Sequence, residues 1–164
     1  MKLSNILNET FDKPFPYKWT KKTEDYWSAE FHLQTKLGNS KVVLNIMMTD
    51  SENWDISFST EAGPYAYGSF SIINSGRAYE IFATIMEAVK EWIQHVNPYM
   101  FTFSASEPSR IKLYSRLISK FLPSGWNHEI VKNPEEAYYL AKRGEITHDD
   151  IIKYKEPEDV DPYW

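Results

Sequence analysis

The hydrophobic pattern changes its period near residue 78, and this change restricts the possible folds more than any other feature of the sequence. Residues 27–58 alternate apolar and polar side chains, as half-buried β-strands do. From residue 78 to residue 96 the apolar side chains recur every three or four positions, which predicts a helix of roughly five turns. Strands followed by a long helix indicate a mixed fold of the α/β or α+β class.

The N-terminal half predicts a short amphipathic helix and then a meander of strands. The helix is expected at residues 3–11, because Pro14 and Pro16 follow its last apolar position. Short turns, such as Gly38-Asn39-Ser40, favour antiparallel pairing of the strands that they connect. The predicted strands cover residues 27–34, 41–49, 54–58 and 65–73.

The C-terminal half predicts strands and helices in alternation, which requires at least one parallel crossover. Pro108 falls in the first turn of a predicted second helix, where its missing N–H group is tolerated. The predicted elements are a strand at 99–105, a helix ending before Pro123, strands at 126–132 and 137–142, and a short helix after Thr147.

These elements suggest one main domain with two extensions. We expect an N-terminal amphipathic helix and linker at residues 1–19, an α/β domain at 20–143, and a polar, acidic C-terminal extension at 144–164. The 164 residues are enough for one domain with a substantial core.

The composition argues against several functional classes. The chain has no cysteine, so disulfides, thiolate catalysis and cysteine-based zinc sites are excluded, and its four histidines lack metal-ligand spacing. With a formal net charge of −5, the chain has no general attraction for phosphate backbones, so nucleic acid is an unexpected partner. No segment resembles a membrane span or a secretory signal, and we expect a cytoplasmic protein.

Two segments contain candidate sites. The first is the turn Asn74-Ser75-Gly76-Arg77-Ala78, where a glycine lets the backbone approach a ligand and the amides of the following helix can bind phosphate. A turn between a strand and a helix also favours glycine for structural reasons alone. The second segment is Glu107-Pro108-Ser109-Arg110-Ile111-Lys112-Leu113-Tyr114, followed later by Gly125-Trp126.

In this order the two segments resemble the second half of the GNAT (Gcn5-related N-acetyltransferase) superfamily, over residues 20–143. Gly76 and Ala78 match the family's Q/R-x-x-G-x-G/A turn, and Tyr114 matches the end of its N-x-x-A-x-x-L-Y helix. The resemblance implies a mixed, mostly antiparallel, centrally splayed sheet with helices on both faces. Three positions depart from the motifs, namely Ile73, Glu107 and Arg110, which stand where the family has Gln or Arg, Asn and a small residue.

The resemblance implies transfer of an acyl group from acetyl-CoA, or another acyl-CoA, to an amine. Gly76, Arg77 and Ala78 would then hold the pyrophosphate, and Tyr114 would protonate the departing CoA thiolate. Packing of Tyr114 in the helix stripe is the alternative interpretation. The departures from the motifs also leave open whether the chain is an enzyme.

The chain is also similar to small uncharacterised proteins of tailed bacteriophages, in residues 3–9, 77–92 and 103–114. This similarity favours an alternative function in which a non-catalytic, GNAT-like scaffold binds a host or virion protein, in the host cytoplasm or on the virion. Aromatic residues make up 16% of the chain and suit such an interface. A stripe of Lys112, Arg116 and Lys120 is a weaker candidate for binding nucleic acid or the CoA 3′-phosphate.

A few other polar residues are candidates whose commoner role is a solvated surface. Glu30 and Asp55 lie on predicted strand faces and could orient an amine, while His128 could serve as a base. His95 ends the long helix, where the helix dipole favours its charged form. A small basic and aromatic cluster also stands near the N-terminus, formed by Lys18, Lys21, Lys22 and Trp19.

Overall fold

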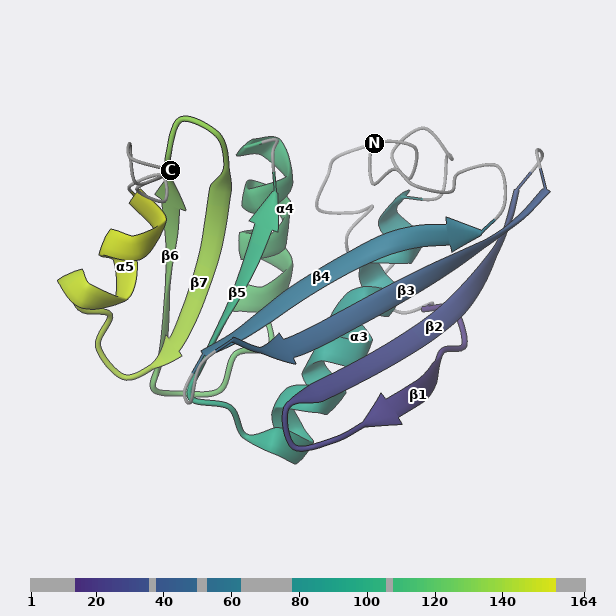
Figure 1. Ribbon diagram of the computed structural model, residues 1–164, viewed down its shortest axis with the longest axis horizontal. Coiled ribbons are helices and arrows are strands. Elements are labelled where there is room, and N and C mark those ends of the chain that lie inside the picture. The colour runs from purple at the N-terminus through teal and green to yellow at the C-terminus, as the bar shows by residue number, and fades with distance from the viewer. Residues whose placement is uncertain (1–13, 36–37, 50–52, 63–77, 106–107, 156–164) are drawn as a thin grey trace, which may run out of the picture. The chain divides into compact units, whose positions relative to one another are not determined.

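The computed structural model describes residues 14–35, 38–49, 53–62, 78–105 and 108–155. Its strands form a mixed sheet in the order β1-β2-β3-β4-β5-β7-β6, in which β4 and β5 pair in parallel and the other pairs recorded are antiparallel (Figure 1). The chain divides into two compact units, Met1–Met48 with Ser57–Asn97 and Thr49–Ile56 with Pro98–Trp164. We describe each unit by itself.

The first unit consists of a β-meander and one long helix. β1 (Lys18–Lys22) pairs with β2 (Tyr26–Thr35), β2 pairs with β3 (Gly38–Met48), and the second part of β4 (Asn53–Ala62) follows. The helix α3 (Ala78–Val96) lies along one face of these strands (Figure 1). The face of the sheet toward α3 carries the buried apolar side chains of β2 and β3, namely Trp27, Ala29, Phe31, Leu33, Val42, Leu44 and Ile46.

The second unit packs one helix on each face of four strands. The start of β4 pairs with β5 (Met100–Ala105), and β5 pairs with β7 (Ala137–Arg143), which pairs with β6 (Trp126–Lys132). On one face the ring of Tyr114, from α4 (Pro108–Ser119), lies 5.1 Å from that of Phe103. On the other face Ile151, from α5 (His148–Lys155), is buried with Met100, Val131 and Leu140.

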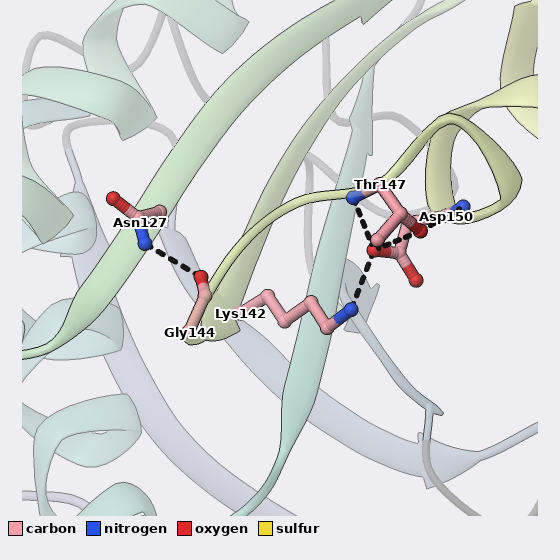
Figure 2. Close-up of polar contacts among 5 residues, drawn as sticks. All are labelled: Asn127, Lys142, Gly144, Thr147 and Asp150. Carbon is pink, nitrogen blue, oxygen red and sulfur yellow. Dashed lines mark hydrogen bonds and ion pairs between the residues drawn. The ribbon is translucent and has the colours of Figure 1, made fainter.

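The start of α5 is fixed by a capping box and an ion pair (Figure 2). A carboxylate oxygen of Asp150 accepts hydrogen bonds from the backbone N–H (2.7 Å) and the hydroxyl (3.0 Å) of Thr147. The same oxygen lies 2.6 Å from the ammonium of Lys142, which is buried on β7. Gly144 connects β7 to this helix at a φ of 88°, a conformation that glycine adopts without strain.

The predicted fold class is confirmed: the fold is of the α+β kind, with a mostly antiparallel sheet. The long helix has the predicted bounds, and the strands predicted at 27–34, 41–49, 54–58, 99–105, 126–132 and 137–142 correspond to β2 to β7. The expected helix at 3–11 and the expected strand at 65–73 lie outside the described residues. The three predicted domain boundaries stay predictions.

The strand β1 is not predicted by the sequence, because lysines make up three of its five residues and hide the strand pattern. The short helix predicted after Thr147 is present as α5, and its Ile151 belongs to the core of the second unit. Of the helices in the described part of the chain, none has the length and apolar character needed to cross a membrane.

Candidate functional site

The residues predicted to bind the cofactor lie mostly outside the described part of the chain. Gly76 and Arg77 belong to the segment 63–77, and Ala78 is the first residue of α3. In an α-helix the first four N–H groups have no partner within the helix, so the first turn of α3 offers donors of the kind that an anion needs. Glu80 places a carboxylate in the same turn and opposes an anion there. The phosphate-binding role of Gly76, Arg77 and Ala78 stays a prediction.

Tyr114, the predicted general acid, is a core residue of the second unit. Only 2% of its surface is exposed, and its ring packs against Phe103 of β5. The alternative interpretation, that Tyr114 packs in the helix stripe, agrees with this position. A catalytic role for its hydroxyl stays a prediction.

A polar cluster on β4 and β5 offers a second candidate site. It lies on the face of these strands opposite the one on which Tyr114 packs. Asp55 of β4 and Thr102 of β5 are register partners in the parallel pair, and the Thr102 hydroxyl donates a hydrogen bond of 3.3 Å to Asp55. Thr102 is buried and Asp55 is half-buried. Their immediate neighbours along the strands are the buried apolar residues Trp54, Ile56, Phe101 and Phe103.

The neighbouring strand β7 extends this cluster with a second carboxylate and a phenol. Tyr138 pairs in register with Ser104, and its hydroxyl donates a hydrogen bond of 2.6 Å to Glu136. Ser104 and Glu136 are exposed. The exposed carboxylate of Glu136 therefore lies close enough to the half-buried Asp55 to act on its charge.

Helix α5 forms one side of the cluster. The side-chain amide of Asn53 donates a hydrogen bond of 2.6 Å to the hydroxyl of Tyr154, and the Tyr154 ring lies 4.8 Å from that of Tyr138. The capping box and the Lys142–Asp150 ion pair hold α5 on the sheet (Figure 2). The shape of the candidate site thus depends on the docking of α5.

The electrostatics of this site favour a cation. Burial raises the pKa of Asp55 above its usual value, and the nearby carboxylate of Glu136 raises it further, while the hydrogen bond from Thr102 lowers it. Burial and the hydrogen bond to Glu136 raise the pKa of Tyr138 to about 12, so its phenol stays protonated at neutral pH. A carboxylate in these surroundings gains from a bound cation and accepts a proton more readily than an exposed aspartate.

Three other candidates from the sequence, namely Glu30, His95 and His128, have structural partners. Glu30 lies 3.4 Å from the ammonium of Lys41 and 4.0 Å from that of Lys18, so its carboxylate is already paired. The Nδ1 atom of His95 lies 3.0 Å from the backbone oxygen of Glu91 near the end of α3. His128 is exposed, and its ring stacks on that of Tyr139. Within the residues that the structure describes, no group of three or more potential ligands is arranged to hold a metal.

Sequence reasoning identified Asp55 but missed Thr102, Glu136, Tyr138 and Tyr154. The available signal was a polar residue flanked by two apolar residues, which occurs in Trp54-Asp55-Ile56 and again in Phe101-Thr102-Phe103, but the alternation of a half-buried strand gives the same pattern. Only the register of the sheet shows that these two residues are neighbours.

Comparison with known proteins finds similarity to solved structures alone. No family model matches the sequence, and no curated protein matches it. A spermidine N-acetyltransferase from Vibrio cholerae is similar at 10% identity over 73% of this chain and 66% of that chain, with a TM-score of 0.41. This chain therefore spans just under two thirds of that enzyme.

Two further structures are similar at comparable levels. An acetyltransferase of the GNAT family from Streptococcus pneumoniae has 12% identity over 76% of this chain and 70% of that chain, with a TM-score of 0.37. A ribosomal-protein-alanine N-acetyltransferase from Escherichia coli has 12% identity over 91% of this chain and 94% of that chain, with a TM-score of 0.38. These similarities concern the course of the backbone and assign no role to any residue of this chain.

Proposed function

We propose that this chain transfers an acyl group from an acyl-CoA to an amine, and that Asp55 binds and deprotonates the amine. The observation that supports the proposal is the half-buried carboxylate of Asp55, hydrogen-bonded to Thr102 on the only parallel strand pair recorded among the described strands. The turn Gly76-Arg77-Ala78 is the proposed binding site for the acyl-CoA.

The proposed chemistry needs one base. An amine enters as an ammonium ion and pairs with Asp55, whose raised pKa suits it to accept the proton. The neutral amine then attacks the thioester carbonyl and the C–S bond breaks; the attacking nitrogen releases a proton to solvent, and the CoA thiolate takes one from solvent. Gly76, Arg77 and Ala78 are proposed to bind the pyrophosphate of the acyl-CoA. Tyr114 lies on the face of the sheet opposite Asp55, so it takes no part in this scheme.

The absence of cysteine gives this proposal a direct assay. Free CoA has a thiol and the protein has none, so a thiol reagent reports CoA release without background from the protein. We expect CoA release from acetyl-CoA to depend on added amine, and calorimetry to detect acetyl-CoA binding that Gly76→Trp abolishes. Absence of binding and of amine-dependent release, with acetyl-CoA present at millimolar concentration, would reject the proposal.

Matched variants test Asp55 and Tyr114 separately. We expect Asp55→Asn to reduce turnover while acetyl-CoA binding is retained, and Glu61→Gln, an exposed carboxylate of the same strand, to leave turnover unchanged. Asp55→Asn with no larger effect than Glu61→Gln would contradict the role of Asp55. Tyr114→Phe and its control Tyr139→Phe, both buried tyrosines of the second unit, are expected to retain turnover. Loss of turnover in Tyr114→Phe alone would favour Tyr114 as the general acid and contradict the scheme centred on Asp55.

A further inference from the structure

The edge of the first unit carries a cluster of aromatic rings that is separate from the candidate amine site. Trp19 of β1 and Trp27 of β2 have ring centroids 5.0 Å apart at an interplanar angle of 85°. Tyr17, just before β1, stands at 90° to Trp19 with a centroid distance of 6.0 Å. Successive rings are thus nearly perpendicular, so their faces form adjoining walls rather than a stack.

A carboxylate of α3 fixes the orientation of two of these rings. One oxygen of Glu91 accepts hydrogen bonds from the hydroxyl of Tyr17 (2.5 Å) and from the indole N–H of Trp19 (2.9 Å). The rings are therefore held in place by side chains of a separate element. The same carboxylate provides a negative charge beside the aromatic walls.

The space beside the walls already holds a cation from the same chain. The ammonium of Lys22 lies 4.9 Å from the centroid of the Trp27 ring and 5.8 Å from that of Trp19, within the range of a cation–π interaction. Lys22 is exposed, and its ammonium is carried by a flexible four-carbon stem. An occupant of this kind can be displaced by a competing cation.

A β-bulge is what places Lys22 on this face. In a regular strand, residues three apart point to opposite faces, so Trp19 and Lys22 would be separated. The register shifts between Trp19 and Lys21, and as a result Trp19 pairs with Ala29 and Lys22 with Trp27. Bulges often re-aim a side chain next to a functional site.

We propose that Tyr17, Trp19, Trp27 and Glu91 form a binding site for an alkylated ammonium group, with Lys22 as its intramolecular occupant. Aromatic cages favour alkylated ammonium groups because these cations are less strongly hydrated than a primary ammonium, while the ring faces still attract their charge. The site does not depend on the proposed acyl transfer, since none of its residues takes part in that proposal.

The test titrates the full-length protein with choline and follows the indole N–H signals of the tryptophans by NMR. Removal of the internal competitor in Lys22→Ala is expected to tighten choline binding about tenfold relative to the unmodified protein. Lys21→Ala is the matched control, because it removes the same charge from the same strand while its ammonium lies over Tyr26 instead. If choline affinity rises equally in both variants, the change in net charge alone explains the effect and the proposal is overturned.

Two further comparisons separate the cage from general hydrophobic binding. The neutral isostere 3,3-dimethyl-1-butanol is expected to bind Lys22→Ala about tenfold more weakly than choline does, because it lacks the charge. In the same background, Trp19→Ala or the more conservative Glu91→Gln is expected to weaken choline binding, with the far-ultraviolet circular dichroism unchanged. Equal binding of the isostere, or choline binding that survives both substitutions, would overturn the proposal.

The source of the cation is distinguished by a second pair of ligands. Blocked trimethyl-lysine and blocked unmodified lysine are titrated in parallel with choline. Tighter binding of trimethyl-lysine than of choline identifies a modified lysine side chain as the ligand, and tighter binding of choline identifies a small quaternary ammonium compound. Failure of all three ligands to shift the indole signals of Lys22→Ala would refute the site.

Discussion

The ion pair between Asp150 and Lys142 offers the sharpest test of how the C-terminal helix is held. The side chains of Lys142 and Asp150 are only 8% and 16% exposed, and their charged atoms are 2.6 Å apart. Asp150→Ala removes this contact, removes the two hydrogen bonds from Thr147, and leaves the ammonium of Lys142 buried without its partner. These three losses act together because a single carboxylate oxygen makes all the contacts (Figure 2).

The expected loss of stability has an upper and a lower bound. Loss of a helix N-cap contact costs about 1 kcal/mol, and removal of one member of a buried ion pair costs about 3–5 kcal/mol. The cost of breaking the buried ion pair is an upper limit, because α5 can detach and let Lys142 reach water. Detachment exposes Ile151, whose burial contributes roughly 1.5–3 kcal/mol. We therefore expect Asp150→Ala to lower the free energy of unfolding by about 3 kcal/mol.

Urea unfolding at neutral pH measures this effect and reports its mechanism. If α5 detaches, the variant exposes less new surface on unfolding, so its m-value falls together with its midpoint. Asp149→Ala is the control, because Asp149 is an exposed carboxylate in the same first turn, and its effect should stay within about 0.5 kcal/mol. Asp150→Ala with no larger effect than Asp149→Ala would refute the reasoning.

The pH dependence of stability gives an independent check. Although burial alone would raise it, the hydrogen bonds from Lys142 and Thr147 hold the pKa of Asp150 below its ordinary value. The stabilisation by Asp150 is therefore present above the unfolded-state pKa, about 3.9, and is lost as the pH falls through the lower folded-state pKa. The difference in stability between the unmodified protein and Asp150→Ala should shrink in that acidic range. A difference that is constant from neutral pH down to about pH 2 would contradict this assignment.

Three further predictions concern other polar groups. Burial raises the folded-state pKa of Asp55, so the favourable contribution of this group is present at acidic pH and is lost as the pH rises through the folded-state pKa. Asp55→Asn should therefore stabilise the protein at pH 7 in urea unfolding, and a loss of stability would contradict this. The fully buried hydroxyl of Tyr139 has no hydrogen-bond partner among the described residues. Tyr139→Phe should therefore raise the thermal midpoint and increase the free energy of unfolding by about 1 kcal/mol. Lysines at the outer strand β1 oppose edge-to-edge pairing, so Lys18→Thr with Lys21→Thr should increase association in light scattering, and an unchanged scattering mass would argue against that role.

Local patterns were sufficient to predict most of the described secondary structure. The helix at 78–96 and the strands β2 and β3 follow from apolar periodicity, because the apolar positions of each element are buried while most of the polar positions between them are more exposed. β1 lacks this contrast: four of its five residues are exposed, and Trp19 is its single half-buried residue. A short edge strand of this kind is defined by its pairing with β2 rather than by its own sequence.

The candidate amine site could not be predicted from the same patterns, because it depends on register. Thr102 and Asp55 are 47 residues apart, and Asn53 and Tyr154 are 101 residues apart. A shift of one residue in the β4–β5 pair would move Thr102 away from its position opposite Asp55. Alternation along each strand gives the face on which a residue lies, but no local signal gives its neighbour on the next strand.

The position of Asp55 argues for a role beyond folding. An aspartate with a raised pKa destabilises the folded state at neutral pH, and one hydrogen bond of 3.3 Å from Thr102 does not offset its burial, since its pKa remains raised. Leucine or asparagine at this position would avoid that penalty. Residues that reduce stability in this way concentrate at functional sites, where activity requires the charge. A gain of stability in Asp55→Asn together with a loss of amine-dependent CoA release is therefore the combination that distinguishes a catalytic carboxylate from a structural one.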